Sequence, residues 1–134
     1  MLEVYSVGVE VAAGAAIPLN TVVLGGRGCS AERVVATSTI QFVKAGVYPV
    51  HVDVSAVATV AGDIAVQLYK NGIAQPQAIQ QETAADTTSR HALSFDTLVQ
   101  AAKSCECQCS NPTNVTIVNA SENPVTFDIH VTIP

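Results

Sequence analysis

The chain has 134 residues and a net charge of −5 at pH 7, with 49% hydrophobic but only 13% charged residues. This length predicts a single domain, residues 1–134, and the composition excludes a disordered chain, which combines many charges with few apolar residues. The six Lys and Arg residues are scattered, so nothing predicts the basic surface that binds a nucleic-acid backbone. We therefore expect one globular domain with no nucleic-acid partner.

The first residues, MLEVYSVGVEVAAG, alternate apolar with polar or small side chains and lack a basic start. This pattern does not fit a signal peptide, which has a basic segment followed by a continuous apolar run. No later stretch reaches the roughly 18 apolar residues of a membrane-spanning helix. The sequence therefore predicts a soluble chain without membrane insertion.

Alternating apolar and polar residues predict strands along most of the chain. In chain order these are residues 2–12, 20–24, 34–37, 40–43, 47–59, 64–70, 73–80, 91–101, 115–119 and 125–133. Asn71-Gly72 predicts a type I′ hairpin turn, because both residues tolerate the positive φ of that turn. Longer loops are expected only at residues 84–89 and 104–114. About eight to ten short strands at this spacing indicate a sandwich or barrel.

The strand expected at residues 47–59 has two different faces. One face is apolar and is predicted to join the core: Tyr48, Val50, Val52, Val54, Ala56 and Ala58. The other face is mixed: Val47, Pro49, His51, Asp53, Ser55 and Val57. The last strand alternates in the same way, with Thr126, Asp128, His130 and Thr132 on its polar face.

The stretch TIQFVKAGVYPVHVDVSAVATVAGDIAVQLYKNGIA has a more specific order than β sequence in general. A long strand begins after Gly46 with Tyr48 two residues on, a Lys70-Asn71-Gly72 hairpin follows, and NVTIVNASENPVTFDIHVTI closes the chain. This succession resembles the jelly roll of tumour necrosis factor and the complement globular heads. The resemblance implies an all-β, TNF-like, two-sheet jelly-roll sandwich that forms a homotrimer. It also implies that the last strand lies in the middle of the inner sheet, antiparallel to the long strand, with that sheet lining the trimer axis.

Under this resemblance, His51, Asp53, Asp128 and His130 would form a polar layer facing the neighbouring subunits. One register sets His51 opposite His130 and Asp53 opposite Asp128, and a second sets His51 opposite Asp128. We expect a hydrogen-bonded layer that fixes subunit register, or a solvated face. The alternative is a divalent metal such as zinc on His51 and His130, with catalysis the least favoured use. Protonating both histidines would place like charge on the axis, which predicts weaker assembly in acid.

Three cysteines, Cys105, Cys107 and Cys109, alternate in KSCECQCSNP. Same-face neighbours on a strand lie about 6.6–7 Å apart, at or beyond the limit for a disulfide, so they cannot all pair locally. Bridges to Cys29 or between subunits, free thiols, and a zinc site in a curled loop all stay open. The resemblance places this segment in a loop at one pole of the fold.

The chain has none of the common catalytic motifs, such as Gly-x-Ser-x-Gly or His-Glu-x-x-His, so we expect no enzyme. His91, beside Arg90, is expected to be a surface residue at the start of a strand.

Small versions of the TNF-like fold occur in bacteriophage virion proteins and in spore-surface filaments, and this compact Val- and Ala-rich chain is similar to those. The prediction is a structural homotrimer of a bacteriophage or prophage virion, made in the bacterial cytoplasm, that contacts other virion proteins as a head-decoration, fibre or tail-associated component. The alternative is a receptor- or glycan-binding module of a bacterial or spore surface, in which residues 25–33 and 84–90 contact a host glycan.

Overall fold

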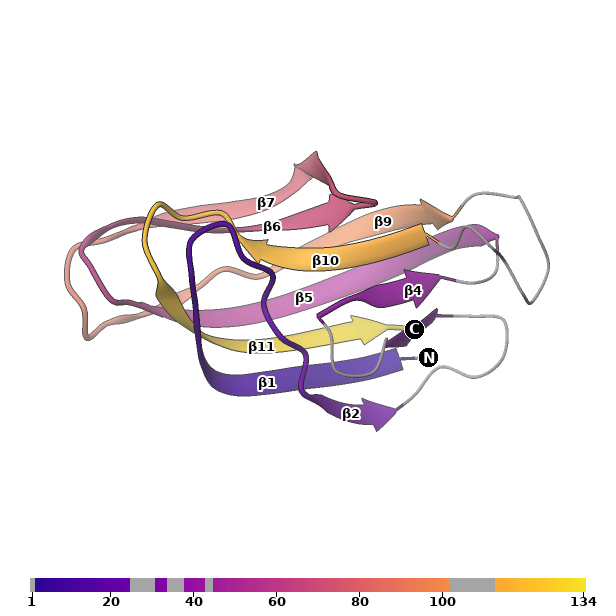
Figure 1. Cartoon of the computed structure of the whole chain (residues 1–134), viewed down its shortest axis with the longest axis horizontal. Helices are drawn as coiled ribbons and strands as arrows, with labels where there is room; N and C mark the ends of the chain where they lie inside the picture. Colours follow the sequence, from indigo (N-terminus) through magenta and orange to yellow (C-terminus); the bar gives the residue numbers. More distant parts are fainter. Residues whose placement is uncertain (1, 25–30, 34–37, 43–44, 102–112) are drawn as a thin grey trace.

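The computed structural model describes residues 2–24, 31–33, 38–42, 45–101 and 113–134, which contain strands and no helix (Figure 1). The strands are β1 (Leu2–Val11), β2 (Thr21–Leu24), β3 (Ala31–Arg33), β4 (Ile40–Phe42), β5 (Gly46–Ala58), β6 (Gly62–Lys70), β7 (Ile73–Ala84), β8 (Arg90–Ala92), β9 (Phe95–Ala101), β10 (Thr113–Asn119) and β11 (Val125–Ile133). None of the described residues form a helix that could cross a membrane. The strand expected at residues 34–37 and the four cysteines, Cys29, Cys105, Cys107 and Cys109, lie outside the described residues.

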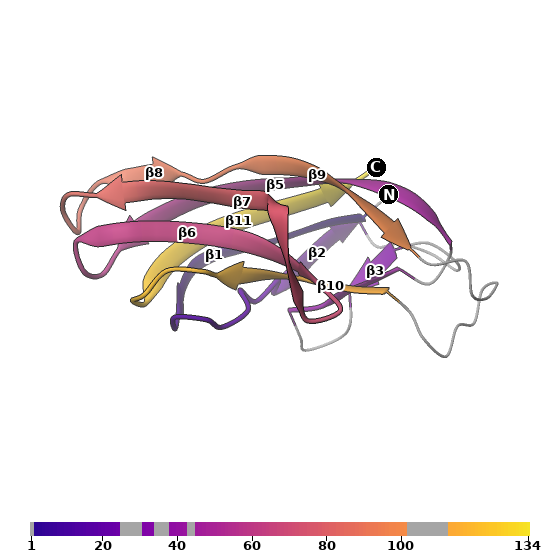
Figure 2. The ribbon, with the colours of Figure 1, turned by 90° about the horizontal axis from the view of Figure 1, so that it is seen from above.

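The strands form two antiparallel sheets. The six-stranded sheet has the order β2-β1-β11-β5-β8, with β9 also pairing with β5, and the five-stranded sheet has the order β3-β4-β10-β6-β7. Figure 1 shows the six-stranded sheet rising from β2 at the bottom of the view to β9, and Figure 2 shows the molecule from above. Strand β11 lies between β1 and β5 and is antiparallel to both, which confirms its expected central place. The predicted all-β, two-sheet jelly roll is therefore confirmed.

The core lies between the sheets and is built by the period-two alternation of the strands. On β5, Val50, Val52, Val54, Ala56 and Ala58 are all buried, as expected for the apolar face. On β11, every second residue from Val125 to Ile133 is buried in the same way. Full burial of an aliphatic or aromatic side chain contributes about 1.5–3 kcal/mol relative to leaving it exposed, so this alternation drives the sheets together.

Turns and strand ends agree with the sequence in some places and differ in others. Asn71 and Gly72 have φ values of 52° and 79°, which confirms the positive-φ hairpin between β6 and β7. Asn71 Oδ1 also accepts the backbone N–H of Asn114 at 2.8 Å, which ties this hairpin to the start of β10. Strand β7 runs on to Ala84, past the expected end at residue 80, and β3 lies within the segment 25–33, where no strand was expected.

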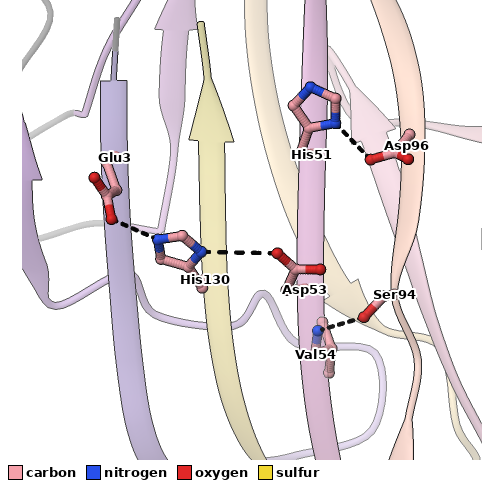
Figure 3. Close-up of polar contacts among 7 residues, drawn as sticks. All are labelled: Glu3, His51, Asp53, Val54, Ser94, Asp96 and His130. Carbon is pink, nitrogen blue, oxygen red and sulfur yellow. Dashed lines mark hydrogen bonds and ion pairs between the residues drawn. The ribbon is translucent and has the colours of Figure 1, made fainter.

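The single strand expected at residues 91–101 is two strands, β8 and β9, with Leu93 and Ser94 between them. Leu93 donates its backbone N–H to the Val54 carbonyl at 2.9 Å. The Val54 N–H donates to Ser94 Oγ at 3.3 Å, so a hydroxyl replaces a backbone acceptor at this point (Figure 3). The alternation of apolar residues does not indicate where a side-chain hydroxyl takes the place of a backbone acceptor. The break between the two strands was therefore not predicted.

A buried amide holds the turn between β10 and β11. Asn119 is fully buried. Its Nδ2 donates to the carbonyls of Val11 at 2.9 Å and Asn123 at 3.2 Å, and its Oδ1 accepts the Ser121 N–H at 3.0 Å. One side chain therefore binds three backbone groups, two of them in buried hydrogen bonds.

Candidate functional site

The candidate site is the side of the six-stranded sheet that points away from the core, which we call the outward face. Residues opposite one another in an antiparallel ladder share a face, so the pairings identify its members on β1, β11, β5 and β9. These are Glu3, Tyr5, Val7 and Glu10 on β1, Thr126, Asp128, His130 and Thr132 on β11, Val47, Pro49, His51, Asp53, Ser55 and Val57 on β5, and Asp96, Leu98 and Gln100 on β9.

The register of β5 and β11 differs from both registers that the sequence suggested. His130 lies opposite Asp53, Asp128 lies opposite Ser55, and His51 lies opposite Thr132. The predicted pairs of His51 with His130, Asp53 with Asp128, and His51 with Asp128 are therefore wrong. The physical reason is that a shift of two residues leaves every side chain on its own face, so alternation alone cannot distinguish these registers.

His130 bridges three strands of the outward face. Its Nε2 lies 2.8 Å from Glu3 Oε1 on β1, and its Nδ1 lies 3.8 Å from Asp53 Oδ2 on β5 (Figure 3). His130 therefore joins β11 to both of its neighbouring strands through contacts with carboxylates.

His51 belongs to a separate pair. Its Nδ1 lies 2.6 Å from Asp96 Oδ1 on β9, directly across the ladder (Figure 3). Within the described part of the chain, no three His, Cys, Asp or Glu side chains are arranged to hold a metal ion. The structure thus brings His130 and Asp53 together and gives His51 a different partner. Glu3 and Asp96, which complete these contacts, were not singled out from the sequence.

Asp128 holds a bulge in β1. The register of β1 against β11 shifts between Ser6 and Val9, and Gly8 has a φ of 65°, in the region that favours glycine. Asp128 Oδ1 accepts the Gly8 N–H at 2.7 Å. The bulge turns Val7 outward, where its side chain is 68% exposed. A glycine inside an alternating strand is the one sequence signal for such a bulge.

Arg90 closes the other side of the Asp128 carboxylate. Its Nη1 lies 3.1 Å from Asp128 Oδ2 and 3.1 Å from Ser55 Oγ. Arg90 therefore connects β8 to the two central strands of the sheet.

The outward face is hollowed beside this bulge. The hollow has a volume of about 410 Å³ and is lined by Tyr5, Ser6, Val7, Asp53, Val54, Ser55, Ser94, Asp128, Ile129 and His130. Its charged groups already contact one another or the backbone.

The outward face carries more negative than positive groups. Among its described residues, the carboxylates of Glu3, Glu10, Asp53, Asp96 and Asp128 outnumber the one guanidinium, that of Arg90. His51 and His130 each lie beside a carboxylate. The expectation that acid weakens assembly stays a prediction.

His91 lies inward, and the prediction of a surface position is wrong. Its side chain is 17% exposed, and its Nδ1 lies 3.1 Å from Glu82 Oε2 on β7. The reason is that His91 pairs with Ala56, which faces the core. The contact links edge strands of the two sheets.

A second, more polar cleft lies where the start of β6, the second half of β7 and the turn between β10 and β11 meet. It has a volume of about 290 Å³ and is lined by Ala61, Gly62, Asp63, Ala65, Ile79, Gln81, Ala120, Ser121, Glu122 and Asn123. Asp63 is held in place by Thr83, whose Oγ1 donates to Asp63 Oδ1 at 2.7 Å.

The loop after β7 is organised by Asp86. Its Oδ1 accepts the backbone N–H of Ser89 at 2.8 Å and that of Thr88 at 3.1 Å. These hydrogen bonds, the one from Ser89 first, lower the pKa of Asp86 below its ordinary value of 3.8.

The chain was compared with known proteins. It matches no family model and no curated protein. Among solved structures, the globular domain of zebrafish complement 1qA protein is similar at a TM-score of 0.68, with 9% identity, over 98% of this chain and 94% of that one.

Two carbohydrate-binding modules are less similar. CBM35 from Cellvibrio japonicus Abf62 gives a TM-score of 0.47 with 11% identity, over 99% of this chain and 95% of that one. CBM36 in complex with calcium and xylotriose gives 0.42 with 11% identity, over the full length of both chains. Both scores are too low to support a functional argument. The likeness to the complement head, together with the two sheets, establishes the fold alone: the chain is a TNF-like jelly roll.

Proposed function

We propose that this chain is a structural, self-assembling protein that forms a homotrimer through the outward face of its six-stranded sheet. We further propose that it serves in a bacteriophage or prophage virion, as a head-decoration, fibre or tail-associated component. The histidine–carboxylate pairs then act in assembly and not in catalysis. The observation that carries the proposal is the combination, on one face, of exposed large apolar side chains with charges that are already paired.

Three of the exposed large apolar side chains lie on the outward face. Val7, Val47 and Leu98 are 68%, 59% and 66% exposed there, while Ile73 and Ile79 are 68% and 40% exposed on β7 of the other sheet. The three on the outward face supply apolar area that an interaction surface can bury. Covering them with a second copy would remove this apolar area from water.

The pairing of charged side chains on the outward face lowers the cost of burying that face. A buried carboxylate without a partner is strongly destabilising, whereas a paired one loses less on desolvation. The contacts of His130 with Glu3, of His51 with Asp96, and of Arg90 with Asp128 are all formed within one chain. The face can therefore be covered without leaving these groups unpaired.

The size of the assembly and its place in a virion rest on the resemblance seen in the sequence. Closed symmetric oligomers are the usual form of self-association, and a trimer is the member that the TNF-like resemblance implies. Light scattering coupled to size-exclusion chromatography measures the mass directly. A trimeric mass supports the proposal, and a monomer at every accessible concentration contradicts it. Mass spectrometry of purified phage particles from the encoding host then tests the virion assignment.

The polar cleft favours a second candidate, binding of a glycan at the surface of a bacterium or spore. Asp63, Gln81, Glu122 and Asn123 surround this cleft with hydrogen-bonding groups that suit sugar hydroxyls. A glycan array with the wild-type chain tests it, using Gln81→Ala and Asn123→Ala as cleft variants and Gln100→Ala, on the outward face, as the matched control. Binding that only the cleft variants lose supports this function, and no binding to any glycan contradicts it.

A further inference from the structure

The outward face carries an apolar ridge and a separate hollow. The first is an apolar ridge made of Val47, Pro49 and Leu98. Pro49 and Leu98 are opposite in the ladder of β5 and β9, and Val47 lies two residues before Pro49 on the same side. The second is the hollow beside the β1 bulge, whose wall is formed by Tyr5 and Val7.

We propose that the ridge of one copy inserts into the hollow of the next copy, with Leu98 packing against Tyr5 and Val7. This inference rests on the proposed self-assembly and names its contact. The ridge uses the first residues of β5 together with β9, whereas the hollow lies further along β5, beside Asp53 and Ser55, so the two are different patches of the same face. A contact between two different patches is head-to-tail, and it closes a ring when the rotation between copies is one third of a turn.

The charges beside the two features point to the same partner. Asp96, two residues before Leu98 on the same face, has a 74% exposed side chain. Arg90, at the rim of the hollow, has a 61% exposed side chain. Its contacts with Asp128 and Ser55 both use Nη1, and a guanidinium carries five N–H donors. Insertion of the ridge therefore brings a carboxylate toward a guanidinium, and the occupant that fits both shape and charge is a second copy of this chain.

Sedimentation velocity of the full chain over a range of concentrations tests the contact. Leu98→Glu and Val7→Glu should each raise the concentration at which half of the chain is assembled by at least about tenfold, since both place a charge in an apolar contact. Ile73→Glu is the matched control, because Ile73 is 68% exposed, as Val7 is, but lies on β7 of the other sheet. The control should assemble as the wild type does. Thermal unfolding followed by circular dichroism checks that each variant is folded.

A charge exchange separates the contact from local damage. Asp96→Arg and Arg90→Asp each place like charges on the two sides of the proposed contact, so each alone should weaken assembly. The double variant restores opposite charges between ridge and hollow, and it should recover at least about tenfold of the lost affinity. The contact is overturned if the double variant does not recover its assembly, or if folded Leu98→Glu assembles as the wild type does. In either case a trimeric wild type still supports the proposed function. A wild type that never assembles overturns both.

Discussion

Replacing Asp128 by alanine should release the bulge in β1 and lower the stability of the outward face. The carboxylate makes a 2.7 Å hydrogen bond with the Gly8 N–H and a 3.1 Å ion pair with Arg90. Hydrogen bonds to a charged group contribute about 1.5–3 kcal/mol, and the exposed position of Gly8 argues for about 1.5. The ion pair adds about 0.5 kcal/mol, because the Arg90 side chain is largely exposed.

The expected loss for Asp128→Ala is therefore about 2 kcal/mol in the free energy of unfolding. For a chain of 134 residues this corresponds to a fall of about 7 °C in Tm. The assay is urea denaturation at one fixed protein concentration, because assembly adds a concentration-dependent term to stability. Amide hydrogen exchange at Gly8 gives a local measurement, since this N–H loses its acceptor in the variant.

Two further variants separate the contribution of the hydrogen bond with Gly8 from that of the ion pair with Arg90. Asp128→Asn keeps an oxygen for the Gly8 N–H and should lose about 1 kcal/mol or less. Arg90→Ala removes only the ion pair, so it should lose about 0.5 kcal/mol and leave exchange at Gly8 slow. An Asp128→Ala protein within about 0.5 kcal/mol of the wild type, with unchanged exchange at Gly8, would refute the view that this carboxylate holds the bulge.

Three further predictions concern the contacts described. Asn119→Ala should cost about 3 kcal/mol in urea denaturation, because three backbone groups, two of them in buried hydrogen bonds, lose this partner; a loss below about 1 kcal/mol would contradict that role. Asp86→Asn should destabilise the protein at pH 7, and the difference should vanish as the pH falls below 3.8. The lowered pKa of Asp86 means that its contribution exists only while the carboxylate is ionised, so an equal difference at pH 7 and pH 2.5 would be inconsistent with it. Gly72→Val should lower stability by about 1–2 kcal/mol, since φ at this turn is 79°, and an unchanged denaturation midpoint would count against a strained turn.

The sequence determined the local features of this protein. The alternation in Gly46–Ala58 and Val125–Ile133 specified both strands and which of their faces joins the core, because side chains in a strand alternate with a fixed period of two. Asn71-Gly72 specified its hairpin, because few other residue pairs tolerate two positive φ values. Gly46 with Tyr48, that hairpin and the closing strand carried the resemblance that placed β11 in the middle of its sheet.

Tertiary structure decided which polar groups meet. The pairing of His130 with Asp53 depends on a register that the two-residue period leaves undetermined. The contact of His130 with Glu3 joins residues 127 positions apart, and that of His51 with Asp96 depends on where the chain breaks between β8 and β9. A local pattern fixes the face on which a side chain lies, whereas its partner is fixed only when distant strands settle into the one register that packs the core.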